Sequence, residues 1–285
     1  MAGGAGETIE ALFADPHAAL LSELSLCHQI TETVPLWRTL VAEPRSLRSL
    51  RASNLGDGAA QLDALTQLEA LWLAGSASFG PLDALPVSPA TRVAHANLRS
   101  LNASARACPA AITGDIDAPR LERFEWVLRD FDDPDELGLE LFSTPTSLLY
   151  HPPPTLRELT VSGGAALDML VALPVFAQLR TLGWHSDHTL ERVLELAPAL
   201  QHLESLSLSP APFAHLPAEA VTGLREQMER AFPSTVLAIS WDAMVERSEP
   251  RRNAEPRRPT SVDADSRDDQ GRMNALARFT QNPRR

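Results

Sequence analysis

A six-residue pattern, L-x-x-L-x-L, recurs eight times along the chain and limits what it can fold into. In every copy the first, fourth and sixth residues are apolar, and successive copies start 21 to 35 residues apart. The copies are LSELSL from Leu21, LRSLRA from Leu47, LEALWL from Leu68, LRSLNA from Leu98, LERFEW from Leu121, LRELTV from Leu156, LRTLGW from Leu179 and LESLSL from Leu203. The fourth and sixth positions alternate with outward ones, which is the period of a half-buried strand rather than a helix. Each copy is therefore predicted to be one short strand.

One such strand cannot bury its leucines alone. Stacking the copies side by side gives a parallel sheet over a continuous leucine core, and the segments that return between strands then cover the other side. Three returns are predicted to be helical, and a fourth, broken by prolines, is predicted to be irregular. The helical returns are 57–67, 164–173 and 187–200, the last with Asp187 as its N-cap, and the irregular return is 108–120.

This repeat resembles a leucine-rich repeat solenoid of the irregular bacterial type, over roughly Leu21 to Ser209. The resemblance implies an α/β fold with parallel strands on a concave side and helices and irregular segments on a convex side. It also implies that exposed strand positions bind a partner. The family's usual ninth residue is Asn or Cys, which bonds neighbouring coils, but no copy here has either. We therefore expect coils without an asparagine ladder.

The chain is predicted to have three parts. Residues 1–20 form an N-terminal capping helix, with Ile9, Leu12 and Phe13 at helical spacing. Residues 21–245 form the solenoid, closed by a C-terminal cap that consists of a helix near 217–232 and a last edge strand near 235–241. Residues 246–285 are rich in charge and proline and nearly devoid of leucine, so we expect a disordered tail.

Composition excludes several classes of function. The net charge of −12 disfavours both a general nucleic-acid binder and an anionic membrane surface. No apolar run approaches the length that spans a bilayer, and two cysteines are too few for a disulfide framework. We expect a cytoplasmic protein.

The candidate binding residues occupy outward strand positions. If the register holds, the third, fifth and seventh residues of each copy face the concave side. The partner-binding candidates, at the third and fifth positions, are Arg51, Trp72, Asn102, Arg123 and Glu125. A large aromatic such as Trp72 at an outward position is either a binding anchor or is covered by the protein's own loops. In contrast, Trp126 and Trp184 occupy the inward sixth position and are predicted to lie in the core.

No catalytic or metal-binding pattern stands out. His185 and His188 lie three apart but fall on different predicted elements, and the acidic run around Asp130 to Glu136 lacks the order of a calcium-binding loop. We expect no enzyme activity, no cofactor and no metal.

The expected function is therefore a non-enzymatic scaffold that binds a protein or peptide on the concave face. The alternative is a structural or assembly protein whose tail makes the contact. Within that tail Met273, Leu276 and Phe279 are three apart, a spacing that suits one face of a short docking helix or that arises incidentally.

Overall fold

The computed structural model describes residues 22–26, 47–52, 62, 64–73, 90, 92–104, 107–127, 137–162, 167–185, 190–209 and 216–241. The chain divides into two compact units, Met1–Val245 and Glu246–Arg285, and every described residue belongs to the first. The predicted N-terminal helix of 1–20 lies outside the described residues. So do the tail of 246–285 and its Met273, Leu276 and Phe279.

Nine short strands form one sheet in which every neighbouring pair is parallel. Their order across the sheet is their order along the chain. They are β1 (Glu23–Leu26), β2 (Ser49–Ala52), β3 (Ala70–Leu73), β5 (Ser100–Ala103), β7 (Arg123–Val127), β8 (Glu158–Ser162), β9 (Thr181–His185), β10 (Ser205–Leu208) and β11 (Val236–Ile239). The first eight coincide with the eight sequence copies, and the ninth is the last strand that the sequence predicts. The protein is thus α/β with a large parallel sheet.

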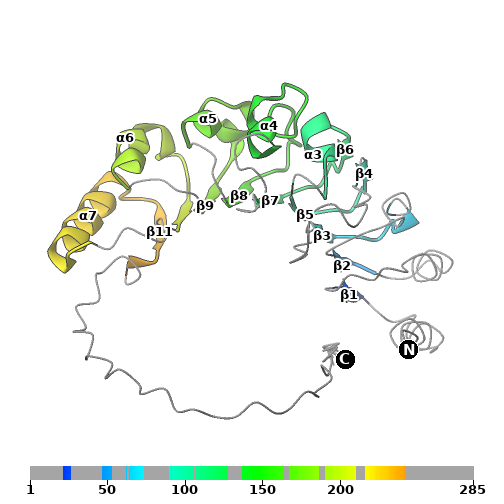
Figure 1. Cartoon of the computed structure of the whole chain (residues 1–285), viewed down its shortest axis with the longest axis horizontal. Coiled ribbons are helices and arrows are strands. Elements are labelled where there is room, and N and C mark those ends of the chain that lie inside the picture. Colours follow the sequence, from blue (N-terminus) through cyan, green and yellow to red (C-terminus); the bar gives the residue numbers. More distant parts are fainter. Residues whose placement is uncertain are drawn as a thin grey trace, which may run out of the picture. The chain divides into compact units, whose positions relative to one another are not determined.

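Helices return the chain from one strand to the next on one side of the sheet (Figure 1). They are α3 (Ala110–Thr113), α4 (Leu137–Ser143), α5 (Leu167–Val171), the 3-10 helix η3 (Pro174–Gln178), α6 (Leu190–Leu200) and α7 (Ala218–Ala231). The predicted returns at 164–173 and 187–200 contain α5 and α6, and α7 occupies the predicted C-terminal helix.

Two returns differ from the prediction. In the segment 57–67, expected to be helical, the described residues 62 and 64–67 form 3-10 turns, with the N–H of Leu65 bonded to the carbonyl of Leu62 at 2.9 Å.

The segment 108–120, expected to be irregular, contains α3 and the short strand β6 (Ile116–Asp117), which pairs with β4 (Val93–Ala94). Pro109 stands at the N-cap of α3, where a proline costs the helix no hydrogen bond. Gly114 ends the helix at a φ of 83°, and a Cβ there would lie 2.3 Å from the carbonyl oxygen of Thr146.

The first, fourth and sixth residues of the copies make the core. From Leu47 to Leu208 all of these residues are at most 2% exposed. Trp126 and Trp184 are both fully buried, which confirms the inward direction of the sixth position. The Trp126 ring centroid lies 5.8 Å from that of Phe124 on the same strand. The Trp184 ring centroid lies 6.2 Å from that of Phe142 of α4, so this second contact joins the sheet to its helical layer.

One backbone pattern joins successive strands. The carbonyl of the second residue of a copy accepts the N–H groups of both the second and the third residue of the next copy. Arg48 and Ser49 both donate to the Ser22 carbonyl, at 2.8 and 3.0 Å, and the same arrangement recurs at each junction up to the Arg180 carbonyl. The strands therefore repeat in hydrogen bonding as well as in sequence.

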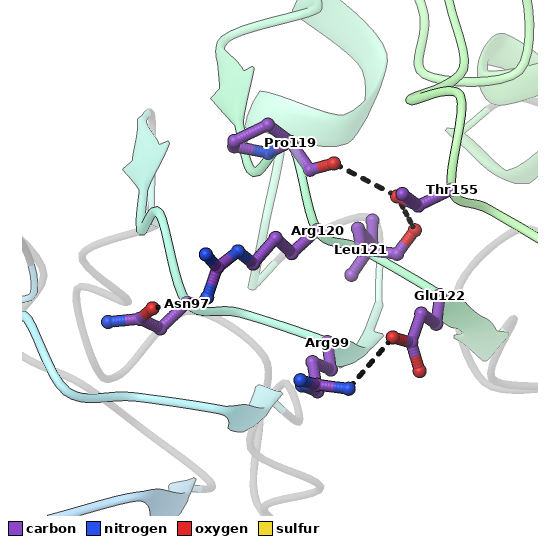
Figure 2. Close-up of polar contacts among 7 residues, drawn as sticks. All are labelled: Asn97, Arg99, Pro119, Arg120, Leu121, Glu122 and Thr155. Carbon is purple, nitrogen blue, oxygen red and sulfur yellow. Dashed lines mark hydrogen bonds and ion pairs between the residues drawn. The ribbon is translucent and has the colours of Figure 1, made fainter.

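Side chains just before the leading leucines also join neighbouring copies of the pattern. Thr155 Oγ1 donates to the carbonyls of Pro119 and Leu121, at 3.0 and 2.8 Å, and Gln178 Nε2 donates to the Pro153 carbonyl at 2.9 Å. Figure 2 shows dashed lines from Thr155 to the carbonyls of Pro119 and Leu121. These bonds satisfy carbonyls between strands without an asparagine ladder.

We expect Thr155→Val to lower the free energy of unfolding by about 1 kcal/mol, because the Leu121 carbonyl loses a partly buried hydrogen-bond donor. Valine has nearly the same shape as threonine, so the change removes little else. Thr155→Ser keeps the hydroxyl and is the matched control. Urea unfolding followed by circular dichroism measures both. Equal midpoints for Thr155→Val and the wild type would show that the junction between these two strands does not depend on this hydroxyl.

Candidate functional site

The outward residues of the strands form one surface, here called the open face. It consists of the third and fifth residues of each strand copy, and the register aligns each into a row. The fifth row is Ser25, Arg51, Trp72, Asn102, Glu125, Thr160, Gly183 and Ser207, and the third row is Glu23, Ser49, Ala70, Ser100, Arg123, Glu158, Thr181 and Ser205. Since side chains of successive strand residues point to opposite sides, both rows face away from the leucine core.

Arg51 and Trp72 form the most distinctive contact on the open face. They are register partners on β2 and β3, and the guanidinium carbon of Arg51 lies 3.9 Å from the centroid of the Trp72 ring. A cation over an aromatic face is attracted by the ring's quadrupole. Arg51 is exposed and Trp72 is half-buried, so both side chains are accessible at the surface. Their contact orients each side chain against the other.

The other predicted residues continue from this pair. Asn102 on β5 is the register partner of Trp72, and Glu125 on β7 is the partner of Asn102. Arg123 lies two residues before Glu125 on the same strand and on the same face, and it is exposed. The structure therefore brings Arg51, Trp72, Asn102 and Glu125 into one row across four strands, with Arg123 in the adjoining row.

Beyond β7 the open face carries smaller side chains. Gly183 is buried although it belongs to an outward row, because a Cβ there would lie 2.7 Å from Thr160 Oγ1 and 3.0 Å from its Cγ2. The Thr160 side chain thus occupies the space beside Gly183 that a side chain at position 183 would need. This half of the face lacks large side chains of the kind found at β2 and β3.

A row of ion pairs flanks the open face and was not predicted. The second residues of neighbouring copies pair across the strands: Arg48 with Glu69 at 3.0 Å, Arg99 with Glu122 at 3.0 Å, and Arg180 with Glu204. Figure 2 shows the Arg99–Glu122 pair at the start of its strands. The sequence does hold the signal, since in each of these three pairs an Arg stands at the second position of one copy and a Glu at the second position of the next. All six side chains are largely exposed, so each pair contributes little stability.

The described residues contain no group of three or more His, Cys, Asp or Glu side chains placed to hold a metal ion. His185 is half-buried at the end of β9, while His188 and the acidic run from Asp130 to Glu136 lie outside the described residues. Cys108 is fully buried, and burial raises the pKa of its thiol to about 12. This thiol is therefore protonated at neutral pH and is not a nucleophile. None of the helices in the described ranges is both long and apolar enough to cross a membrane.

Comparison with known proteins gives a fold but no family. The chain matches no protein-family model, and no curated protein matches it. A crystal structure of a protein from Bacteroides fragilis, a structural-genomics target, is similar with a TM-score of 0.55 at 16% sequence identity. The match covers 84% of this chain and 70% of that one. At this identity the likeness concerns the fold alone.

We expect Trp126→Ala to lower the free energy of unfolding by about 3–5 kcal/mol, because it opens a cavity in a fully buried core. Trp72→Ala should cost only about 1 kcal/mol, since it mainly removes the stacking with Arg51 on a half-exposed ring. Urea unfolding of both variants measures the contrast. Equal losses would mean that Trp72 is a core residue and not part of a surface site.

The Cys108 thiol should make the protein less stable at alkaline pH. The unfolded chain loses this proton near the ordinary pKa of 9.0, whereas the folded chain holds it until about 12. Stability is therefore full below about pH 9 and falls as the pH rises toward 12. In a Cys27→Ser background, the free energy of unfolding should fall by about 2 kcal/mol more between about pH 8 and about pH 10.5 than in the matched Cys27→Ser/Cys108→Ala protein. The same dependence of the free energy of unfolding on pH in both proteins would contradict a raised pKa for Cys108.

Proposed function

We propose that the protein is a leucine-rich repeat solenoid of the irregular bacterial type that acts as a cytoplasmic, non-enzymatic scaffold and binds a protein or peptide on its open face. Eight copies of L-x-x-L-x-L coincide with eight successive parallel strands, and the same backbone hydrogen bonds recur between them. This repetition favours a solenoid, in which each coil contacts mainly its neighbours. The open face is then the concave face that the family uses for binding.

The Arg51–Trp72 pair is the observation that carries the binding proposal. Arginine and tryptophan are the residue types that most often dominate binding energy at protein interfaces. Here they stack at 3.9 Å on outward positions, so a partner meets a large aromatic whose geometry is already fixed. Asn102 and Glu125 extend the row with hydrogen-bonding groups for a polypeptide. The net charge of −12 favours a protein partner over nucleic acid.

Affinity purification with mass spectrometry tests the proposal on the full chain. The double variant Arg51→Ala/Trp72→Ala should lose at least about tenfold of a specific partner, because two adjacent interface side chains are removed. The matched control is Arg225→Ala/Gln227→Ala, two exposed changes on α7, which should retain the partner. If both double variants recover the partner equally well, the open face around β2 and β3 is not the binding surface.

A chain that ends at Val245 separates the scaffold from the alternative in which the tail of 246–285 makes the contact. Under the scaffold proposal this shortened chain keeps its partner, provided that its circular dichroism matches the full chain. Loss of the partner on truncation, with retention by Arg51→Ala/Trp72→Ala, would favour the assembly role.

A further inference from the structure

The last strand of the sheet leaves apolar residues incompletely covered. Leu237 and Ile239 of β11 are register partners of Leu206 and Leu208, which are 0% and 2% exposed. Leu237 and Ile239 continue this inward row but are only half-buried, and Val236 beside them is 68% exposed. The inward residues of β11 are therefore less buried than those of the strand beside it.

The backbone of β11 forms an edge of the sheet among the described residues. Within the described part of the chain, β11 pairs with β10 and with no other strand. The N–H of Val236 donates to the Glu204 carbonyl, so the backbone groups of Val236 point toward β10. Backbone groups alternate in direction along an extended strand, so those of Leu237 and Ile239 point outward. Leu237 and Ile239 thus have backbone N–H and C=O groups that point away from β10, and their side chains are half-buried.

Proteins usually protect such an edge with charge, proline or a bulge. The stretch from Val236 to Ser240 contains neither a charged residue nor a proline, whereas β1 at the opposite end of the sheet carries the exposed Glu23. The two ends of the sheet thus differ in chemistry. Among the described residues, the β11 end lacks the charge that β1 carries and therefore suits the addition of a further strand.

We propose that β11 pairs in antiparallel fashion with β11 of a second copy of this chain, which joins two sheets into one continuous sheet. A two-fold axis normal to the sheet and passing beside Ala238 sets Leu237 opposite Ile239 of the second copy, and Ile239 opposite its Leu237. These are the residues whose backbone groups point outward, so each opposed pair exchanges both hydrogen bonds. The same axis keeps both leucine cores on one side of the joined sheet, where the half-covered side chains cover one another.

The second copy fits this edge better than the chain's own tail does. Two identical uncharged strands meet without opposing like charges. The segment 246–285 instead carries ten arginines, seven acidic residues and four prolines, which would set charges and missing donors against an apolar strand. Self-pairing of β11 is also independent of what the open face around Arg51 and Trp72 binds, since the two surfaces share no residue.

Charge at Ala238 tests the pairing, because this exposed residue lies beside the axis and meets itself. In sedimentation velocity the full-length wild type should show a concentration-dependent monomer–dimer equilibrium. Ala238→Glu and Ala238→Arg should each raise the dimer dissociation constant at least about tenfold, since like charges face each other. An equimolar mixture of the two variants should restore the dimer, which also shows that both are folded. Ser25→Glu on β1 is the matched control and should leave the dimer unchanged.

Hydrogen exchange supplies the second measurement. The amides of Leu237 and Ile239 should gain protection as the protein concentration rises, while the amide of Ala238, directed toward β10, should not. A wild type that stays monomeric at every concentration overturns the proposal, and protection of Leu237 and Ile239 in that monomer identifies the chain's own tail as the occupant. A dimer that neither Ala238 variant weakens also overturns it, because the contact then lies elsewhere.

Discussion

The fold depends on the fact that no strand of this sheet can bury its own apolar residues. Each strand has only four or five residues, and its inward leucines are covered by the strands on either side and by the returning segments. Leu101, for instance, is fully buried between Leu71 and Phe124, its partners on the neighbouring strands. Such a row is stable only if each inner strand has a neighbour of the same pattern on both sides. In this sheet the copies before and after it along the chain supply those neighbours.

The spacing between copies, by contrast, varies, because only the strand and the residues just before it must match the neighbouring strand. Copies start between 21 and 35 residues apart, yet the carbonyl of the second residue accepts the same two N–H groups at seven successive junctions. Side chains ahead of the leading leucine add bonds that differ from coil to coil: a threonine hydroxyl at Thr155, an amide at Gln178 and an imidazole at His202, whose Nε2 lies 3.0 Å from the Phe176 carbonyl. Different side chains thus bond the backbone of the preceding copy at equivalent positions.

Much of this was predictable from sequence, because a period of two along a strand and a repeat between strands are both local signals. They gave the inward positions of Trp126 and Trp184 and the outward positions of Arg51 and Trp72. The pairing of β4 with β6 was missed because two residues carry no detectable period, and their pairing depends on how the chain returns between larger strands. The stacking of Arg51 on Trp72 was also not foreseen as a contact, since it depends on side-chain rotamers that the strand register permits but does not fix.

The separation of the two sides of the sheet explains where function and assembly can arise. The inward rows are fixed by packing, so residues such as Leu50 and Leu71 are not free to change, whereas the outward residues of the same strands contribute little to the core. Position 72 can therefore hold a tryptophan in a row otherwise made of small or polar residues, at modest cost to the fold. The same reasoning applies in the opposite sense at β11. There an inward row continues with no following strand among the described residues, and the half-buried Leu237 and Ile239 give the last strand a reason to bind another strand that the inner strands lack.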